Sequence, residues 1–81
     1  MIEYARPAKR SLTLAGHRTS VTLEDPFWRA FQALARSEGV SVNALAARID
    51  AARPDDVGLA SAIRVYTLES VLSDRPAIAA A

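Results

Sequence analysis

Polar and apolar side chains alternate along "SLTLAGHRTSVTL", residues 11 to 23. Successive side chains of a strand point to opposite faces, so a period of two indicates a half-buried strand. The sequence therefore predicts two short strands, over residues 11–14 and 17–23. Gly16 tolerates a positive φ, which makes a hairpin the simplest connection between them.

The alternation also assigns the two faces of the second strand. If Val21 and Leu23 point inward, then Arg18, Ser20 and Thr22 point outward together. These three polar side chains, spaced two apart, are left without a structural role.

From residue 25 the period changes to that of a helix. Asp25 is placed to cap free amides, and Pro26 suits a first helical turn. A first helix is predicted from Pro26 to about Glu38, with Phe27, Phe31 and Leu34 near one stripe and Gly39 as a left-handed stop.

Two further helices follow. Ser41 is a good N-cap for a second helix that ends near Arg53, since Pro54 disfavours helix in the residue before it. A third helix is predicted over residues 59–73, with an apolar face wider than half its circumference. Such a face needs two neighbours, and we expect one of them to be a second subunit.

Composition supports the same expectation. The 81 residues amount to one domain at most, and a core of that size supplies only about 3 to 5 kcal/mol. There is no cysteine and His17 is the single histidine, so neither disulfides nor a thiolate or histidine-cluster metal site is expected. Oligomerisation remains as the stabilising device, and we expect a homodimer. Its core is predicted from the apolar positions Val21, Leu23, Phe27, Phe31, Leu34, Val42, Leu45, Ile49, Ile63 and Tyr66.

Charge is distributed unevenly although the net charge is only +1. The first 23 residues carry four basic side chains against one acidic, and the rest of the chain is acidic. We expect a flexible basic arm at 1–9, a folded domain at 10–73 and a C-terminal tail at 74–81. No signal peptide or apolar run of membrane length is visible, so a cytoplasmic protein with no membrane association is predicted.

Catalytic chemistry has little support in this sequence. His17 has no cysteine partner, and the three glycines are scattered rather than gathered in a phosphate-binding loop. The acidic pairs at 24–25 and 55–56 are explained by helix starts and loops. We therefore expect that the protein is not an enzyme and holds no cofactor or metal. Its function is expected to be binding.

A strand, a helix, "EGVSVNALAARID" and another helix, in this order, resemble the ribbon-helix-helix family of bacterial DNA-binding proteins of the Arc and MetJ type. The likeness covers residues 17 to about 50 in general form. It extends to 9–72 for a subfamily of short bacterial proteins, through "KRSLTLAGHRTSVTLEDPFWRAFQALARSEGVSVNALAARID" and "LASAIRVYTL".

The resemblance implies an α+β, mostly helical fold and an intertwined homodimer that regulates transcription. In this family two chains contribute one strand each to an antiparallel ribbon that enters the major groove of double-stranded DNA. It implies base contacts by Arg18, Ser20 and Thr22, of which Arg18 suits guanine best. Phosphate contacts are expected from the basic arm and from the start of the second helix: Lys9, Arg10, Ser41, Val42 and Asn43.

The extra strand at 11–14 leaves alternatives open. A four-stranded sheet made by two hairpins would span about 14 Å, too wide for an undeformed groove. The first strand could peel away, or track the DNA backbone, or the sheet could bind protein instead. The alternative function is a protein-interaction module, such as an antitoxin-like or adaptor dimer, that uses the wide apolar face of the third helix.

Overall fold

The computed structural model describes Ile2 and residues 4–73. Two strands precede three helices, as the alternation and the helical periods predict. The elements in chain order are β1 (Ala8–Leu14), β2 (His17–Leu23), α1 (Asp25–Ser37), α2 (Val42–Ala52) and α3 (Leu59–Ser73). The tail expected at 74–81 lies outside the described residues. None of the described helices combines the length and the apolar composition needed to cross a membrane.

The two strands pair with each other as an antiparallel hairpin. Ala15 and Gly16 form the turn with φ of 50° and 84°, the pair of positive angles that a tight two-residue hairpin connection requires. β1 begins at Ala8, three residues before the expected start at Ser11, because pairing with β2 continues to the end of that strand at Leu23. Two residues expected in the flexible arm, Ala8 and Lys9, are therefore in the sheet.

The start of α1 differs from the expected one. Its N-cap is Glu24, which contributes its backbone carbonyl to Trp28 without a side-chain cap. Asp25 was expected to cap the helix but lies in its first turn, where a negative charge favours the positive end of the helix dipole. Gly39 has a φ of 72° just after the helix, in agreement with the predicted left-handed stop.

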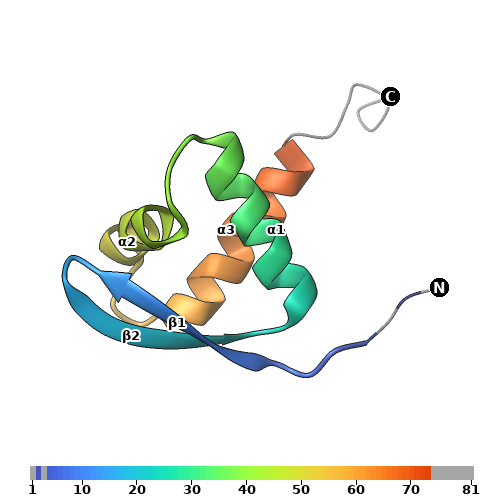
Figure 1. Ribbon diagram of the computed structural model, residues 1–81, viewed down its shortest axis with the longest axis horizontal. Coiled ribbons are helices and arrows are strands. Elements are labelled where there is room, and N and C mark those ends of the chain that lie inside the picture. Colours follow the sequence, from blue (N-terminus) through green and yellow to red (C-terminus); the bar gives the residue numbers. More distant parts are fainter. Residues whose placement is uncertain (1, 3, 74–81) are drawn as a thin grey trace.

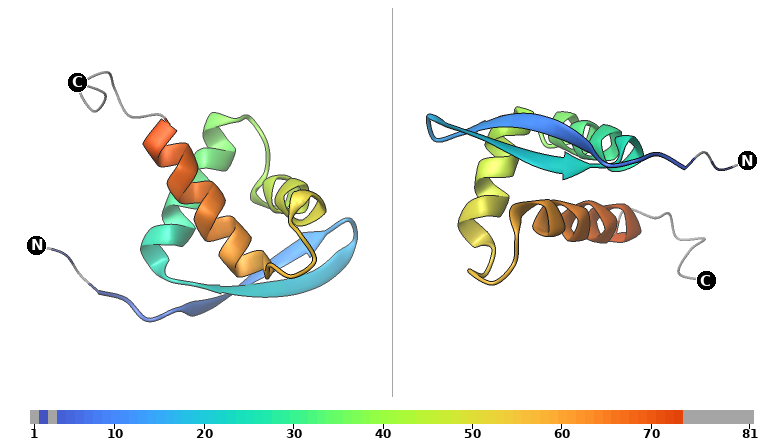
Figure 2. Two further views of the ribbon diagram at one scale, coloured as in Figure 1. Left: turned by 180° about the vertical axis from the view of Figure 1, so that it is seen from behind. Right: turned by 90° about the horizontal axis from the view of Figure 1, so that it is seen from below.

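The hairpin lies along one end of the three helices, and α2 stands near its turn (Figure 1). A view from below shows the hairpin and α1 in one layer and α3 in the layer beneath it (Figure 2). Both strands therefore present one face to the helices and leave the other to solvent.

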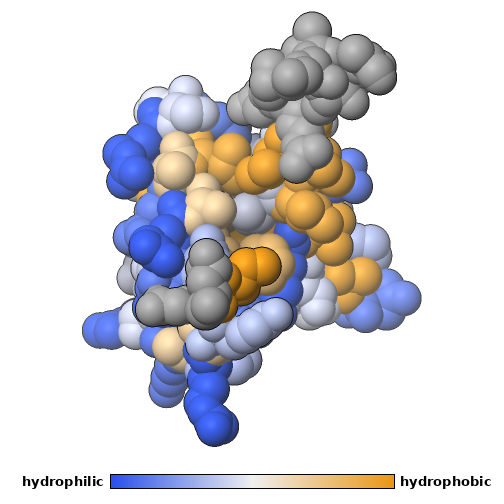
Figure 3. Space-filling view, turned by 90° about the vertical axis from the view of Figure 1, so that its right-hand side faces the viewer, coloured by the Kyte–Doolittle hydropathy of each residue, from blue (hydrophilic) through white to orange (hydrophobic). Residues whose placement is uncertain are grey.

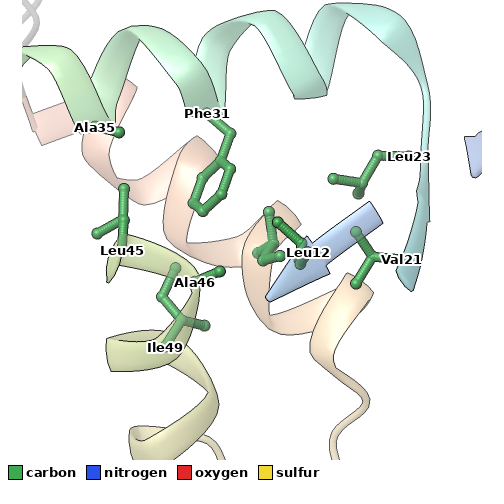
Figure 4. Close-up of a cluster of buried hydrophobic side chains, with 9 residues drawn as sticks. Leu12, Val21, Leu23, Phe31, Ala35, Leu45, Ala46 and Ile49 are labelled. Atoms are coloured by element: carbon green, nitrogen blue, oxygen red, sulfur yellow. The ribbon is translucent and has the colours of Figure 1, made fainter. Parts of the chain in front are cut away.

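The core fills the space between the inward face of the hairpin and the helices (Figure 4). Phe31, at 0 % exposure, lies near its centre and forms a tilted aromatic pair with Trp28, with 6.2 Å between ring centroids. The buried apolar residues are Leu12, Val21, Leu23, Phe31, Ala35, Leu45, Ala46, Ile49 and Ile63.

Six of the ten residues expected in a dimer core are buried within this single chain, and Leu34, Val42 and Tyr66 pack against them partly buried. Phe27 is half-buried under the guanidinium of Arg64, 5.8 Å from the ring centroid. The burial of the six therefore needs no second subunit, and their place in a dimer interface stays a prediction.

Candidate nucleic-acid interface

Six polar side chains cover the solvent face of the hairpin, which we call the outward face. They come from three cross-strand pairs, Lys9 with Thr22, Ser11 with Ser20 and Thr13 with Arg18. All six are exposed and none is acidic. The two positively charged side chains, Lys9 and Arg18, belong to the first and the last of these pairs. The other four side chains carry hydroxyl groups.

The three residues expected to face bases lie together on this surface. Arg18, Ser20 and Thr22 alternate with the buried Val21 and Leu23, as the period of two predicts. Arg18 forms no ion pair or side-chain hydrogen bond within the described part of the chain, so its guanidinium is free to bind a ligand. Their contact with bases stays a prediction.

Ser11 and Thr13 share the outward face but were missed from the sequence. The alternation placed them opposite Leu12, yet only the pairing register shows that they lie directly across from Ser20 and Arg18. Lys9 also belongs to this face and is held in β1 rather than in a flexible arm.

Arg10 does not lie on the outward face, and the phosphate contact expected from it stays a prediction. It occupies the inward face, where its guanidinium donates to the Leu23 carbonyl and to Asp25, each at 3.4 Å. The same group lies over the Trp28 ring, 5.6 Å from the centroid, and the side chain is only 19 % exposed. Arg10 therefore fastens β1 to the start of α1. One signal of this placement was present in the sequence. Arg10 lies two positions before the buried Leu12, and side chains two apart in a strand point to the same face.

The start of α2 lies beside the edge of the hairpin. Ser41 caps the helix as predicted, with its Oγ accepting the Ala44 amide at 3.0 Å. Asn43 Oδ1 accepts the backbone amide of Thr13 at 3.0 Å, so this side chain serves to join α2 to β1. The backbone amides of Val42 and Asn43 belong to the first turn, where helical amides have no partner within the helix.

Arg64 of α3 contacts the opposite edge of the hairpin. Its Nη2 donates to the Thr22 carbonyl at 3.0 Å and to Glu24 Oε1 at 2.9 Å. A hydrogen bond from its own backbone amide and the bonds from Arg64 lower the pKa of Glu24 below its usual range. The carboxylate nearest the end of β2 is therefore matched by a cation.

The second surface of interest is apolar and lies on α3. Four large apolar side chains there are each between 45 and 60 % exposed. We call them the α3 patch: Val65, Leu68, Val71 and Leu72. Figure 3 shows hydrophobic side chains gathered in a band on this side of the molecule. A groove of about 660 Å³ between α2 and α3 adjoins the patch at Val65 and is lined largely by apolar side chains.

A charged cluster lies at one end of that groove. Glu38 receives hydrogen bonds from the Tyr66 hydroxyl and from Arg48, and these bonds lower the pKa of its carboxyl. The same bond to Glu38, with burial, raises the pKa of Tyr66. These contacts join the end of α1 to α2 and α3, which identifies the cluster as a structural one.

Comparison with known families and proteins shows which family this chain resembles. The family model for the ribbon-helix-helix domain matches residues 7–71, which include the whole hairpin, α1 and α2 and all but the last two residues of α3. No curated protein and no solved structure matches the chain. Because the match spans most of the 81 residues, the chain belongs to the ribbon-helix-helix domain family, whose members are generally non-enzymatic DNA-binding proteins.

Proposed function

We propose that the protein is a cytoplasmic, homodimeric regulator of transcription that binds double-stranded DNA in a sequence-specific manner. The observation that carries this proposal is the outward face of the hairpin, on which six exposed side chains are either hydroxyl-bearing or positively charged. A two-stranded antiparallel ribbon with such a face suits the major groove.

Dimensions and chemistry both favour this binding mode. Two paired strands lie about 4.8 Å apart, and the major groove is about 12 Å wide, so a two-stranded ribbon has room to enter. The Arg18 guanidinium is long enough to bond guanine O6 and N7, and Ser20 and Thr22 supply hydroxyls for other base edges. Arg18 is accordingly proposed as the principal base contact.

Phosphate contacts are proposed from Lys9 and from the start of α2. The bond between Asn43 and Thr13 keeps that helix start next to the hairpin, so an inserted hairpin brings it close to the DNA backbone. The amides of Val42 and Asn43, the Ser41 hydroxyl and the helix dipole favour an anion there. Such contacts set the position of the protein and do not read sequence.

The homodimer is supported by the α3 patch. A small protein gains stability from covering such a patch, and Val65, Leu68 and Leu72 recur at spacings of three and four, which suit packing against another helix. Sedimentation at micromolar concentration tests it, with Leu68→Glu expected to give a monomer. A wild-type monomer would contradict the proposed dimer.

The same patch supports a second candidate function, a protein-interaction module of antitoxin or adaptor type. The adjoining apolar groove offers room for a partner segment. The two candidate functions require different surfaces. Binding to DNA requires the outward face, and binding to a protein requires the α3 patch.

Selection of bound fragments from the genomic DNA of the host tests the principal proposal. A recurring sequence among the fragments is expected, with binding in a mobility-shift titration that weakens as salt rises. Lys9→Ala should weaken binding to all sequences and lower the salt slope by about one. Absent binding, or binding independent of salt, would contradict DNA recognition.

A further inference from the structure

The two outer edges of the hairpin contact different helices. On the edge of β1, the Thr13 amide donates to Asn43 Oδ1 at the start of α2, at 3.0 Å. On the edge of β2, the Thr22 carbonyl accepts a hydrogen bond from Arg64 of α3, also at 3.0 Å. The hairpin therefore has the proposed phosphate-binding helix start on its β1 side and the helix of the α3 patch on its β2 side.

This arrangement indicates the strand order in the proposed homodimer. The α3 patch is the surface proposed to pack against the second copy, and α3 lies at the edge of β2. Among the described residues, Arg64 bonds this edge at Thr22 alone, so the edge at Arg18 and Ser20 is open to a partner strand. The two copies of β2 then pair at the centre of the sheet, in agreement with the ribbon of one strand from each subunit that the family resemblance implies. Each β1 lies outside its own β2.

Dimensions then separate the roles of the two strands. Neighbouring strands lie about 4.8 Å apart, so each β2 is about 2.4 Å from the middle of such a sheet and each β1 is about 7.2 Å from it. Half the width of the major groove is about 6 Å. The two copies of β2 therefore fit between the walls of the groove, whereas each β1 coincides with a wall. That wall is the phosphodiester backbone.

We infer that β1 is the phosphate-contacting strand of the sheet, with Lys9, Ser11 and Thr13 against the DNA backbone, while the base contacts belong to β2. The inference rests on the proposed function and adds Ser11 and Thr13 to its phosphate contacts. It gives the two members of each cross-strand pair on the outward face different roles. The β1 residue contacts phosphate, and the β2 residue contacts a base.

The side chains of β1 suit this role. Lys9 supplies an ammonium group, and Ser11 and Thr13 supply hydroxyl donors. All three side chains are exposed, and none makes a hydrogen bond or ion pair within the described part of the chain. Lysine, serine and threonine side chains are common donors to phosphate oxygens. Because the bond from Asn43 to Thr13 holds the start of α2 beside them, one stretch of backbone can meet both the strand and the helix start.

Selection of bound sequences distinguishes the two strands. Ser11→Ala and Ser20→Ala remove the same hydroxyl from the two members of one cross-strand pair, so each is the matched control for the other. Ser11→Ala should weaken binding to all sequences alike, by about 3- to 10-fold, and leave the preferred bases unchanged. Ser20→Ala should change the preferred base at one position. A changed preference in Ser11→Ala would overturn the role assigned to β1.

Methylphosphonate substitution locates the phosphate contacts. Replacing single phosphates of a selected site by uncharged methylphosphonates should weaken binding of the wild type wherever a phosphate is bound. Ser11→Ala and Thr13→Val should each lose this sensitivity at one position, because the contact is already absent. Ser20→Ala should keep the sensitivity of the wild type at both positions.

The outcomes separate this inference from the proposed function. If Ser11→Ala and Thr13→Val keep the full sensitivity of the wild type at every position, these side chains contact no phosphate. The inference is then overturned, while DNA binding by the protein stands. A wild type that binds no DNA would overturn both.

Discussion

Nη2 of Arg64 lies 2.9 Å from Oε1 of Glu24, joining α3 to the residue at which β2 ends and α1 begins. The two side chains are 40 positions apart in the sequence, and each is about 30 % exposed. The contact holds the end of the hairpin against the third helix. It therefore fixes how the outward face is presented relative to the body of the protein.

Arg64→Met should lower the urea midpoint of unfolding, because it leaves Glu24 without its cation and the Thr22 carbonyl without its donor. Arg36→Met is the matched control, since Arg36 is exposed at the end of α1 and forms no ion pair within the described residues. Equal midpoints for the two variants would contradict the role assigned to Arg64.

Thr67→Val should raise stability, by about 1 kcal/mol. Thr67 is 2 % exposed, and its hydroxyl has no hydrogen-bond partner among the described residues. Valine keeps the shape and removes the unpaired polar group. Thr67→Ser keeps the hydroxyl and loses the methyl, so it should be less stable than the wild type. Urea titrations measure both, and a valine variant less stable than the wild type would show that the hydroxyl has a partner.

Acid should destabilise the fold through Glu24 and Glu38. Hydrogen bonds hold the pKa of each carboxyl below its unfolded value of about 4.3. The resulting stabilisation is complete above the unfolded pKa and is lost as pH falls through the folded pKa. Glu38→Gln should flatten the dependence of the urea midpoint on pH below about 4.3. If the slope of the urea midpoint against pH is unchanged, the pKa of Glu38 is the same in the folded and the unfolded protein.

Ser41→Asp separates helix capping from phosphate binding. Aspartate is as good an N-cap as serine, so the urea midpoint should hold, whereas Ser41→Ala should cost about 1 kcal/mol. The added negative charge would repel a phosphate at the start of α2, so Ser41→Asp should weaken DNA binding. Undiminished affinity in the aspartate variant would exclude a phosphate at this helix start.

Much of the fold follows from local rules. The alternation in 17–23 places the second strand at its observed bounds, and Ser41 and Gly39 mark helix ends where the structure has them. The third helix has its predicted bounds of 59 and 73. In each case the signal is a period or a cap, which depends on neighbours in the sequence.

The remaining features depend on long-range pairing. β1 begins at Ala8 because of its partner strand. The spacing from Leu12 indicates the inward face for Arg10, but no local pattern shows that its partners there are Asp25 and Trp28. Glu24 took the capping position expected for Asp25, with its side chain held by Arg64 from α3. The outward face was accordingly predicted as three residues of one strand, whereas the hairpin register adds three from the other.

The outward face as the DNA-binding surface is tested most directly by Arg18→Ala compared with Arg36→Ala. Both remove one exposed arginine, but Arg36 belongs to the last turn of α1. That end of α1 lies away from the hairpin (Figure 1). In mobility-shift titrations on a selected site, Arg18→Ala should lose about 1 to 3 kcal/mol of binding free energy, about 5- to 150-fold, with an unchanged urea midpoint. Arg36→Ala should bind as the wild type does. Equal affinities for the two variants would contradict DNA recognition by the hairpin.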